Sequence, residues 1–544
     1  MRSPLDISLK PPRHQGLVRG TCGIVTINQR SAKRYFFCGD ELILEKLPIG
    51  TRVIYPRPPA DVVPDFRAAV REAIEHPVGS DPLPSLLSPG MKVTIVIPDN
   101  ASPIPLMKRP DVRQFVLELL LDLLADKGVD DVHVLVAVGL HRHNRPAEIE
   151  RMVGPRVWSA LGPDRIRNHD AEDPDGMLQI GETESGSPVR INRRAAERDI
   201  VISISIGLAP LSGGHKLIAV GLADYPTIRV HHDPHTMKHT ESIMDPTRSR
   251  MHDGINAAGS VIKKEMRVFQ LEVVLNNRTF GTALDFLAKN EDEFSATDWL
   301  RFKSAQLAIR VAPTAGKRAI TNRIRGAYGP MAVHAGDVEA AHAKTLADIH
   351  AQLDVQVGEQ ADIVIIGLPN LAPYRVASIQ NPIITQVFAL GYFFSFNRGT
   401  PVVRKGGTFI VCHPCDDTID EATHPSYVPF YHELLAETRD AATLSEKYEA
   451  EYAANAQWID AFRFRYAYHP AHPFFIWSWG ERARDWTGRI IAAGAKNRRA
   501  AERIGWEPAR NLTEAIDMAR DSAPPNPSIT VLHLPPPFVC DVAV

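Results

Sequence analysis

The sequence predicts an α/β protein of two or more lobes with mainly parallel sheets. Its 544 residues exceed the size of a usual single domain. Short β-branched runs bounded by turn residues alternate with stretches of helical periodicity, which is the pattern of βαβ units. Polar residues follow several of these runs directly, and in open α/β sheets ligand-binding residues gather at the carboxyl ends of the strands.

The composition favours a small-molecule partner. Hydrophobic residues make up 44% of the chain, charged residues 23%, and the formal net charge is −2. A chain so close to neutrality has no broad attraction for nucleic acid or for an anionic membrane. No segment approaches the roughly 20 apolar residues that span a bilayer, and residues 1–16 lack the apolar core of a signal peptide. Five scattered cysteines give no disulfide framework. We therefore expect a soluble cytoplasmic protein.

The expected elements follow in chain order. Residues 1–50 are expected to form an arm or small hairpin on the first lobe, and residues 280–330 a mostly helical insertion. Residues 335–353 are expected to form a helix that bridges to the second lobe. The expected strands are 92–98 (KVTIVIP), 132–138, 199–207, 270–275, 331–334, 361–367, 407–412 and 528–534, with a hairpin at 180–191 and helices at 61–75, 111–127 and 513–520.

Three strand ends supply the candidate functional residues. Asp99 follows the first buried strand, and His141 follows the second within GLHRHN. The third strand leads into Leu211–His232, LSGGHKLIAVGLADYPTIRVHH, which contains Lys216 and ends on a histidine pair. Because the carboxyl ends of parallel strands share one edge of the sheet, these side chains are expected to lie near one another.

Taken alone, these motifs leave alternatives open. Ser212, Gly213 and Gly214 before Lys216 could cradle a phosphate or form an ordinary strand-to-helix turn, and the P-loop spacing is absent. The histidines suit nickel, zinc or copper, but no compact zinc pattern occurs, and a solvated loop is the preferred interpretation of residues 233–239. The CHPC sequence at residues 412–415 could be redox-active or half of a metal site; without a second CxxC we favour a structural role.

Together, the ordered motifs resemble the lactate racemase family, which racemises or epimerises 2-hydroxy acids with a nickel-pincer nucleotide. The resemblance covers most of the chain and implies two α/β lobes with an interdomain active-site cleft. It divides the chain into a cofactor-binding domain, residues 1–337, and a C-terminal α/β domain, residues 338–544. The motifs are HPVGSDPL, KVTIVIPDNASPIP, VAVGLHRHN, NHD, SGGHK, IAVGLADYPTIRVHH, LEVVLNN, VHAGDVEAAH, ADIVIIGLPN and GGTFIVC.

The resemblance also implies roles for individual residues. Lys216 resembles the lysine that joins the cofactor through a thioamide-type bond, and His232 the histidine that completes the square-planar nickel coordination. His141 matches one of two catalytic acid/base histidines. Asp99 matches an aspartate beside the cofactor. The further cofactor-binding residues implied are Ser212, Gly213, Gly214 and Gln380.

Three departures from the family pattern concern the substrate side of the site. Ser102 stands where the family usually has an arginine, and the segment before Lys216 is shortened and lacks the second catalytic histidine. The second-lobe motif keeps Gln380 but not its lysine. For the missing catalytic histidine we consider His215 and His143 first, and then His169. Arg229 or Lys405 could replace the missing cationic groups and hold an anion.

The sequence thus predicts a racemase or epimerase of a hydroxy acid other than lactate itself, by reversible hydride transfer through a nickel-pincer nucleotide on Lys216. The predicted catalytic residues are His141 and His215, and the metal ligand is His232. A one-way oxidoreductase with the same cofactor is an alternative, and so is a binding or regulatory relative without the cofactor.

Overall fold

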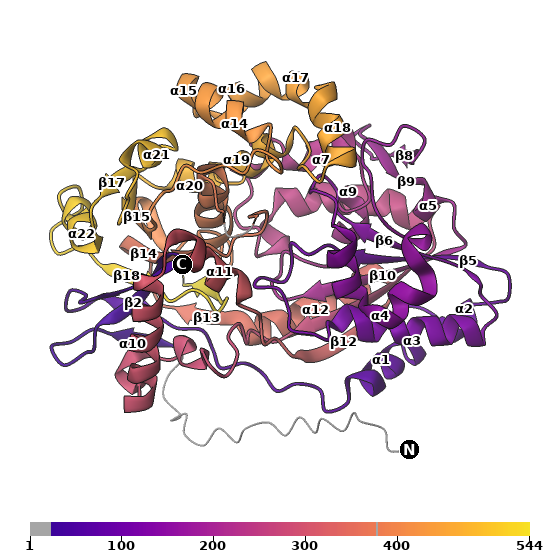
Figure 1. Cartoon of the computed structure of the whole chain (residues 1–544), viewed down its shortest axis with the longest axis horizontal. Coiled ribbons are helices and arrows are strands. Elements are labelled where there is room, and N and C mark those ends of the chain that lie inside the picture. Colours follow the sequence, from indigo (N-terminus) through magenta and orange to yellow (C-terminus); the bar gives the residue numbers. More distant parts are fainter. Residues whose placement is uncertain (1–22, 377–378, 544) are drawn as a thin grey trace.

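The computed structural model describes residues 23–376 and 379–543. Two α/β lobes lie side by side, which confirms the predicted fold class (Figure 1). Residues 1–16, for which the sequence predicted no signal peptide, lie outside the described ranges, as does Ser378 of the second-lobe motif. Within those ranges, every helix is too short or too polar to cross a membrane.

The first lobe is built on a six-stranded sheet with the order β12-β11-β10-β5-β6-β7, in which only β12 is antiparallel to its neighbour. All the strands predicted in this region are present. The β-branched side chains of Ile95 and Ile97 are fully buried in the core below the sheet. The strands are β5 (Lys92–Pro98), β6 (Asp131–Ala137), β7 (Ile166–Asn168), β10 (Ile200–Gly207), β11 (Val268–Leu275) and β12 (Pro330–Gly336).

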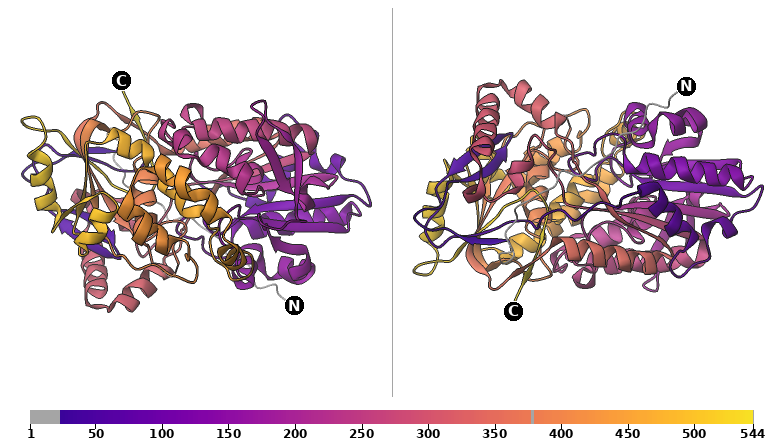
Figure 2. Two further views of the ribbon diagram at one scale, coloured as in Figure 1. Left: turned by 90° about the horizontal axis from the view of Figure 1, so that it is seen from above. Right: turned by 90° about the horizontal axis from the view of Figure 1, so that it is seen from below.

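Helices cover both faces of this sheet (Figure 2). The predicted hairpin is the antiparallel pair β8 (Met177–Glu182) and β9 (Pro188–Asn192). The helix expected to bridge the lobes packs on β11 and β12 of the first sheet. The helices are α1 (Phe66–Glu75), α2 (Leu83–Leu86), α3 (Val112–Asp126), α4 (Pro146–Arg165), α5 (Arg193–Ala196), α6 (Lys216–Ala219), α7 (Tyr225–His232), α8 (Pro234–Lys238), α9 (Arg250–Glu265) and α12 (Val338–Leu353).

The second lobe contains a nine-stranded sheet whose central order is β4-β18-β14-β15-β16-β17, all parallel. A short parallel pair, β13 (Asp354–Val357) with β19 (Val539–Val542), lies apart from it. The strands are β1 (Ile24–Thr26), β2 (Arg34–Gly39), β3 (Glu41–Glu45), β4 (Arg52–Ile54), β14 (Ala361–Pro369), β15 (Val403–Cys412), β16 (Arg489–Ala493), β17 (Glu507–Ala509) and β18 (Ile529–Leu532).

The N-terminal arm belongs to this second sheet, so the expectation that it lies on the first lobe is wrong. β4 pairs in parallel with β18, and β2 pairs with the end of β14, where Cys38 faces Leu368. The predicted hairpin itself is correct, because β2 and β3 are antiparallel partners. A hairpin pattern specifies local pairing but not the distant sheet edge that completes its hydrogen bonds. Each lobe therefore contains chain from both sides of residue 337.

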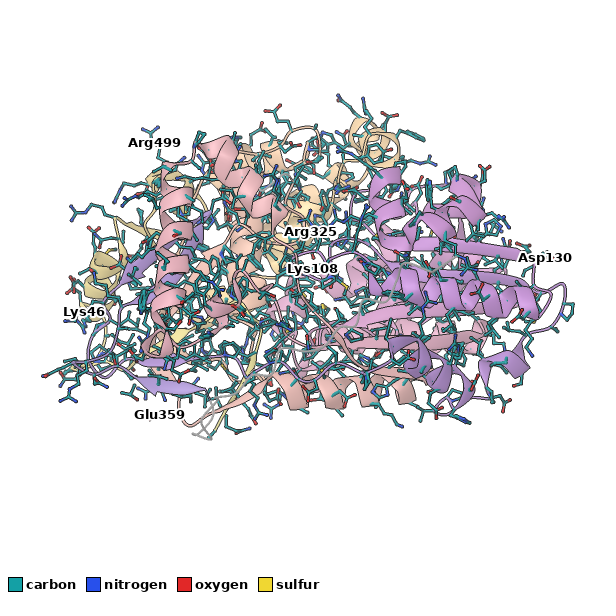
Figure 3. All side chains as sticks on the ribbon, turned by 60° about the horizontal axis from the view of Figure 1, so that its bottom comes forward. Lys46, Lys108, Asp130, Arg325, Glu359 and Arg499 are labelled. Carbon is teal, nitrogen blue, oxygen red and sulfur yellow. The ribbon has the colours of Figure 1, made fainter. Side chains whose placement is uncertain are left out.

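The segment 280–330 is helical, as predicted, and crosses from the first sheet to the second lobe. Phe286 and Phe302 are fully buried against the β2–β3 hairpin, and buried Arg34 pairs with Asp292. The chain then returns to the first lobe, where the carbonyl oxygen of Gly326 accepts a hydrogen bond of 3.2 Å from the amide of Lys108. Figure 3 labels Lys108 and Arg325, the residue before Gly326, close to each other. The helices are α10 (Ala296–Val311) and α11 (Thr314–Arg323).

Short helices of residues 427–486 lie over the junction of the lobes (Figures 1 and 2). α19 contacts both α7 of the first lobe and α13 of the second, and one apolar core runs from Leu140 to Phe475 across the junction. The remaining helices are α13 (Pro382–Gln386), continued by a π-helical turn (Val387–Phe393), α14 (Tyr427–Pro429), α15 (Leu435–Glu437), α16 (Ala441–Leu444), α17 (Ala450–Ala453), α18 (Ala456–Phe464), α19 (His472–Ser478), α20 (Glu481–Trp486), α21 (Arg498–Arg503) and α22 (Leu512–Arg520).

Gly139, directly after β6, gives a test of this framework. Its φ of +53° disfavours other residues, and an added Cβ would lie 2.8 Å from the carbonyl oxygen of Val220. We predict that Gly139→Ala lowers the free energy of unfolding by about 3 kcal/mol, through backbone strain and overpacking. Gly90→Ala is the matched control: Gly90 has φ +82° but open space around it, so its cost is about 1 kcal/mol. Urea unfolding followed by tryptophan fluorescence measures both, and equal losses would contradict the close approach.

Candidate active site

A cavity of about 290 Å³ lies where the carboxyl ends of β5, β6 and β10 meet the second lobe. Asp99, His141 and Lys216 all line it, so the three strand ends come together as the sequence predicted. The opposite wall comes from the second lobe, including residues of the π-helical turn and of α19. A ligand in this cavity would contact both lobes, which is the usual place for a site in an open α/β architecture.

Asp99 and His141 form a hydrogen-bonded pair. The Asp99 carboxylate is 2.8 Å from Nδ1 of His141, and its other oxygen accepts a bond of 3.1 Å from the amide of Ala101. A buried carboxylate at Nδ1 holds a proton on that nitrogen and leaves Nε2 unprotonated in the neutral ring. Asp99 is buried, whereas the His141 side chain keeps 29% of its surface exposed. His141 is therefore an oriented base in the cavity.

Lys216 begins α6 with its amine in an apolar environment. Nζ donates to the carbonyl of Leu211 at 3.2 Å and lies 5.7 Å above the ring centroid of Trp479. Burial lowers the pKa of Lys216 to about 7, because the charged form loses its hydration there. A substantial fraction of the amine is thus neutral at pH 7 and can act as a nucleophile.

The glycines before Lys216 shape a tight turn rather than a complete anion cradle. Gly213 has φ +110° and Gly214 φ +57°. Ser212 and Gly213 line the cavity, but Gly214 does not: its amide donates to the buried carboxylate of Glu272 at 2.7 Å. The Gly214 N–H is therefore not directed to this cavity, and its predicted role in cofactor binding stays a prediction that this placement does not favour.

His232 ends α7 and lines the same cavity. Its Nδ1 is 2.7 Å from Nδ1 of buried His231, and burial holds the pKa of His232 well below its usual range. The ring is accordingly neutral, the state in which imidazole binds metals. With Nδ1 directed to His231, Nε2 is the nitrogen available to a ligand.

Two predicted residues lie outside the cavity. His215 points away from it, with Nε2 2.9 Å from the Glu339 carboxylate and its ring against Gly259 of α9. Gln380 is buried and accepts a hydrogen bond of 3.1 Å from the amide of Ala372. Neither side chain lines this cavity, so the catalytic role of His215 and the cofactor-binding role of Gln380 stay predictions that this placement does not favour. His215 is adjacent to Lys216 in the sequence, but in a helical turn adjacent side chains point in different directions.

The other substitutes also lie elsewhere. His143 packs on Phe462 outside this cavity, and His169 is fully buried with a bond of 2.9 Å to a backbone carbonyl. Arg229 pairs with Glu449, and Lys405 lies over Trp486. Most of the expected loop 233–239 forms α8, Pro234–Lys238, and both His235 within it and His239 after it are exposed.

The second lobe contributes functional candidates that the sequence analysis missed. His472, at the start of α19, lines the cavity, with its ring centroid 5.5 Å from that of His141. Nδ1 of His472 contacts the hydroxyl of Tyr427 at 2.5 Å. The hydroxyls of Tyr374 and Tyr392 are 2.7 Å apart at the same wall. His472 and Tyr427 follow no predicted strand end, so only the general abundance of Tyr, Trp and His in residues 416–485 pointed to them. No feature of the sequence analysis pointed to Tyr374 and Tyr392, which lie before that stretch.

Among the described residues, no group of three or more His, Cys, Asp or Glu side chains is arranged to hold a metal ion. A metal at His232 would therefore need ligands from a cofactor. Cys412 and Cys415 are buried, and burial raises the pKa of both thiols. A buried thiol that resists ionisation is a poor nucleophile and metal ligand, in keeping with a structural role.

The similarities to known proteins agree with the geometry of the site. Residues 42–245 match the model of the lactate racemase N-terminal domain. The chain is 31% identical over 168 residues to the lactate racemase of Lactiplantibacillus plantarum. It is 28% identical over 173 residues to that of Thermoanaerobacterium thermosaccharolyticum. Each match covers 30% of this chain and 37% of the relative, so the sequence likeness spans little more than a third of these enzymes.

The fold likeness is more extensive than the sequence likeness. The structure of the lactate racemase apoprotein from T. thermosaccharolyticum aligns with a TM-score of 0.60 and 20% identity. The alignment covers 94% of this chain and all of that one. The second lobe therefore shares the architecture although its sequence has diverged.

The low pKa of Lys216 can be measured directly. We predict that in apoprotein the amine of Lys216 reaches half-maximal reactivity with trace acetic anhydride near pH 7, because burial disfavours the ammonium. Solvent-exposed lysines, which titrate near pH 10.4, serve as internal controls. Mass spectrometry of tryptic peptides gives both profiles, and a Lys216 midpoint above pH 9 would contradict the apolar environment.

Proposed function

We propose that this chain, a relative of the lactate racemases over residues 42–245, is a racemase or epimerase of a hydroxy acid other than lactate. We further propose that it carries a nickel-pincer nucleotide tethered to Lys216. The observation that supports this best is the placement of a lysine with a pKa lowered to about 7 and a neutral histidine in the lining of one cavity. When bound, the nucleotide would supply the hydride acceptor and donor of the reaction.

The residues present fit such a group. A thioamide-type bond requires an unprotonated amine, which the lowered pKa of Lys216 provides. His232 would be the nickel ligand through Nε2, with His231 fixing the tautomer from behind. Ser212 and Gly213 would lie beside the nucleotide, and the ring of Trp479 would cover the tether. A single protein ligand suits a cofactor that contributes the remaining donors.

His141 is the proposed base for the substrate hydroxyl. In its neutral form it would accept the hydroxyl proton at Nε2, while Asp99 at Nδ1 stabilises the imidazolium that results. The same ring returns the proton in the reverse direction. Asp99 is thus a positioning residue for His141 rather than a direct contact of the cofactor.

His472 is the proposed second acid/base group, in place of His215. It comes from the opposite lobe, lines the cavity, and has Nδ1 held by the Tyr427 hydroxyl, so Nε2 is the nitrogen available to substrate. Inversion at a carbon requires proton acceptors for two orientations of the hydroxyl, and His141 and His472 offer one from each lobe. Lobe movement would be needed to admit substrate, since the two rings are in contact.

A one-way oxidoreductase with the same cofactor is the second candidate. It is favoured by the unequal partners of the two histidines: Asp99 carries a charge that stabilises a protonated His141, whereas the Tyr427 phenol gives His472 no such support. Oxidation of a single enantiomer needs only one base, so one well-supported histidine would suffice, and an external electron acceptor would have to reoxidise the cofactor after each turnover.

The cofactor proposal predicts a covalent mass and a metal. Protein produced in a host that makes the nucleotide should carry both nickel and an adduct on Lys216, measured by metal analysis and intact-protein mass spectrometry. Lys216→Met should lose both, because it lacks the nucleophile; His232→Ala should keep the adduct and lose most of the nickel. His215→Ala, whose side chain lies outside the cavity, is the control that retains both. Wild-type protein without adduct or nickel would support a cofactor-less relative.

The two-histidine proposal predicts complementary losses. His141→Asn and His472→Asn should each lower racemisation by about 10²–10⁴-fold, the usual contribution of general acid/base catalysis. Each variant should still form the trapped keto acid from one enantiomer, and the two variants should prefer opposite enantiomers. Chiral chromatography with hydrazine trapping measures this, and His143→Asn is the control. Full racemisation by His472→Asn, or loss of the same enantiomer in both variants, would refute the pairing.

A further inference from the structure

The cavity wall contributed by the second lobe is strongly apolar. The π-helical turn at Val387–Phe393 presents Phe388 and Phe393, and Phe396 follows directly after it. Phe475 and Ile476 of α19 complete this surface. We call these five residues the apolar wall; all are buried in the closed structure. Such a wall excludes water from any group placed against it and offers that group little besides apolar contact.

The apolar wall connects to the proposed base through a row of rings. The His141 ring is 4.9 Å from that of Tyr374, whose hydroxyl meets that of Tyr392. Tyr392 then lies 6.2 Å from Phe388, which is 4.6 Å from Phe393. A substrate with its hydroxyl at His141 therefore has aromatic surface within reach of its side chain.

The end of the cavity near Lys216, the proposed tether, lies on the side of Tyr392 opposite Phe388 and Phe393. Trp479 is 5.2 Å from the Tyr392 ring, 5.7 Å from the His232 ring, and 5.7 Å from Nζ of Lys216. Phe388 and Phe393 are thus separated by the Tyr392 ring from the residues that would hold the cofactor. This arrangement assigns Phe388 and Phe393 of the apolar wall to the substrate side chain, whereas Phe475, whose ring is 5.8 Å from that of His232, borders the end of the cavity near the tether.

Charge in the lining gives a second, independent constraint. Among the described residues that line the cavity, Asp99 and Lys216 are the only members of the Asp, Glu, Lys and Arg set. Asp99 is hydrogen-bonded to His141, and Lys216 is the proposed tether of the cofactor. A carboxylate of the substrate would then meet neutral donors such as the tyrosine hydroxyls and Ser102, so strong charge pairing does not contribute to its binding. Most of the binding free energy must come from apolar contact.

We infer that the substrate is a 2-hydroxy acid carrying an aryl or bulky branched alkyl side chain, which the apolar wall binds; this inference rests on the proposed function. A methyl side chain would leave the wall unfilled, whereas a phenyl ring would bury apolar area against it. The apolar wall, rather than a cationic clamp, then sets specificity.

Turnover by the nickel-loaded protein tests the substrate class. The probes are the enantiomers of 3-phenyllactate and of lactate, with racemisation followed by chiral chromatography. We expect kcat/KM for 3-phenyllactate to exceed that for lactate roughly 100-fold, as burial of a phenyl group predicts. Equal values, or a preference for lactate, would overturn the inference.

Variants of the apolar wall locate the effect. Phe393→Ala should lower kcat/KM for 3-phenyllactate about 10-fold or more relative to kcat/KM for lactate, because only the larger side chain reaches that ring. Phe396→Leu is a milder variant that keeps the core filled if Phe393→Ala does not fold. Phe464→Ala is the control, since Phe464 is 67% exposed and does not line the cavity. An unchanged preference in both wall variants would overturn the inference.

Calorimetric binding to the apoprotein separates this inference from the proposed function. 3-Phenyllactate should bind apoprotein at least about 10-fold more tightly than lactate, and the difference should shrink in Phe396→Leu. Selective binding without any turnover by nickel-loaded protein would refute the proposed racemase while supporting the apolar wall. Turnover without side-chain selectivity would do the opposite.

Discussion

Burial of the Lys216 amine between the lobes is the constraint on which the site depends. The amine lies where the first sheet ends and Trp479 of the second lobe covers it. Neither lobe alone would exclude water from this nitrogen, so the lowered pKa is a property of the assembled pair. The same burial keeps His232 neutral. A cavity that was more open to solvent would leave the amine mostly protonated and therefore less reactive as a nucleophile.

The lobes are held together by chain that crosses between them in both directions. The N-terminal strands complete the second sheet, and the segment 280–330 leaves the first sheet to pack on the β2–β3 hairpin. α19 returns across the junction to contact α7, which carries His232. These crossings couple the position of His472 to that of His232. They also limit how far the lobes can separate without breaking buried contacts.

The two lobes contribute different kinds of residue to the cavity. The first lobe contributes residues that follow strand ends: His141 held by Asp99, Lys216, and His232, the proposed metal ligand. The second lobe offers shape: a row of aromatic rings and one histidine at a helix start. This explains why the sequence likeness to lactate racemases is confined to 30% of the chain although the fold likeness covers 94% of it. A wall that meets a substrate side chain can change while the architecture stays the same.

By itself, the sequence determined the local elements and the chemistry of the first lobe. Short β-branched runs bounded by turn residues favour buried strands, and residues that follow neighbouring parallel strands meet at one edge of the sheet, so Asp99, His141 and Lys216 were expected together. Only the tertiary structure decided the direction of each side chain and the partners that come from far along the chain. It turned His215 toward Glu339, gave the Gly214 amide to Glu272, and brought His472 to His141. Periodicity specifies which face of an element is buried, but not which distant surface will bury it.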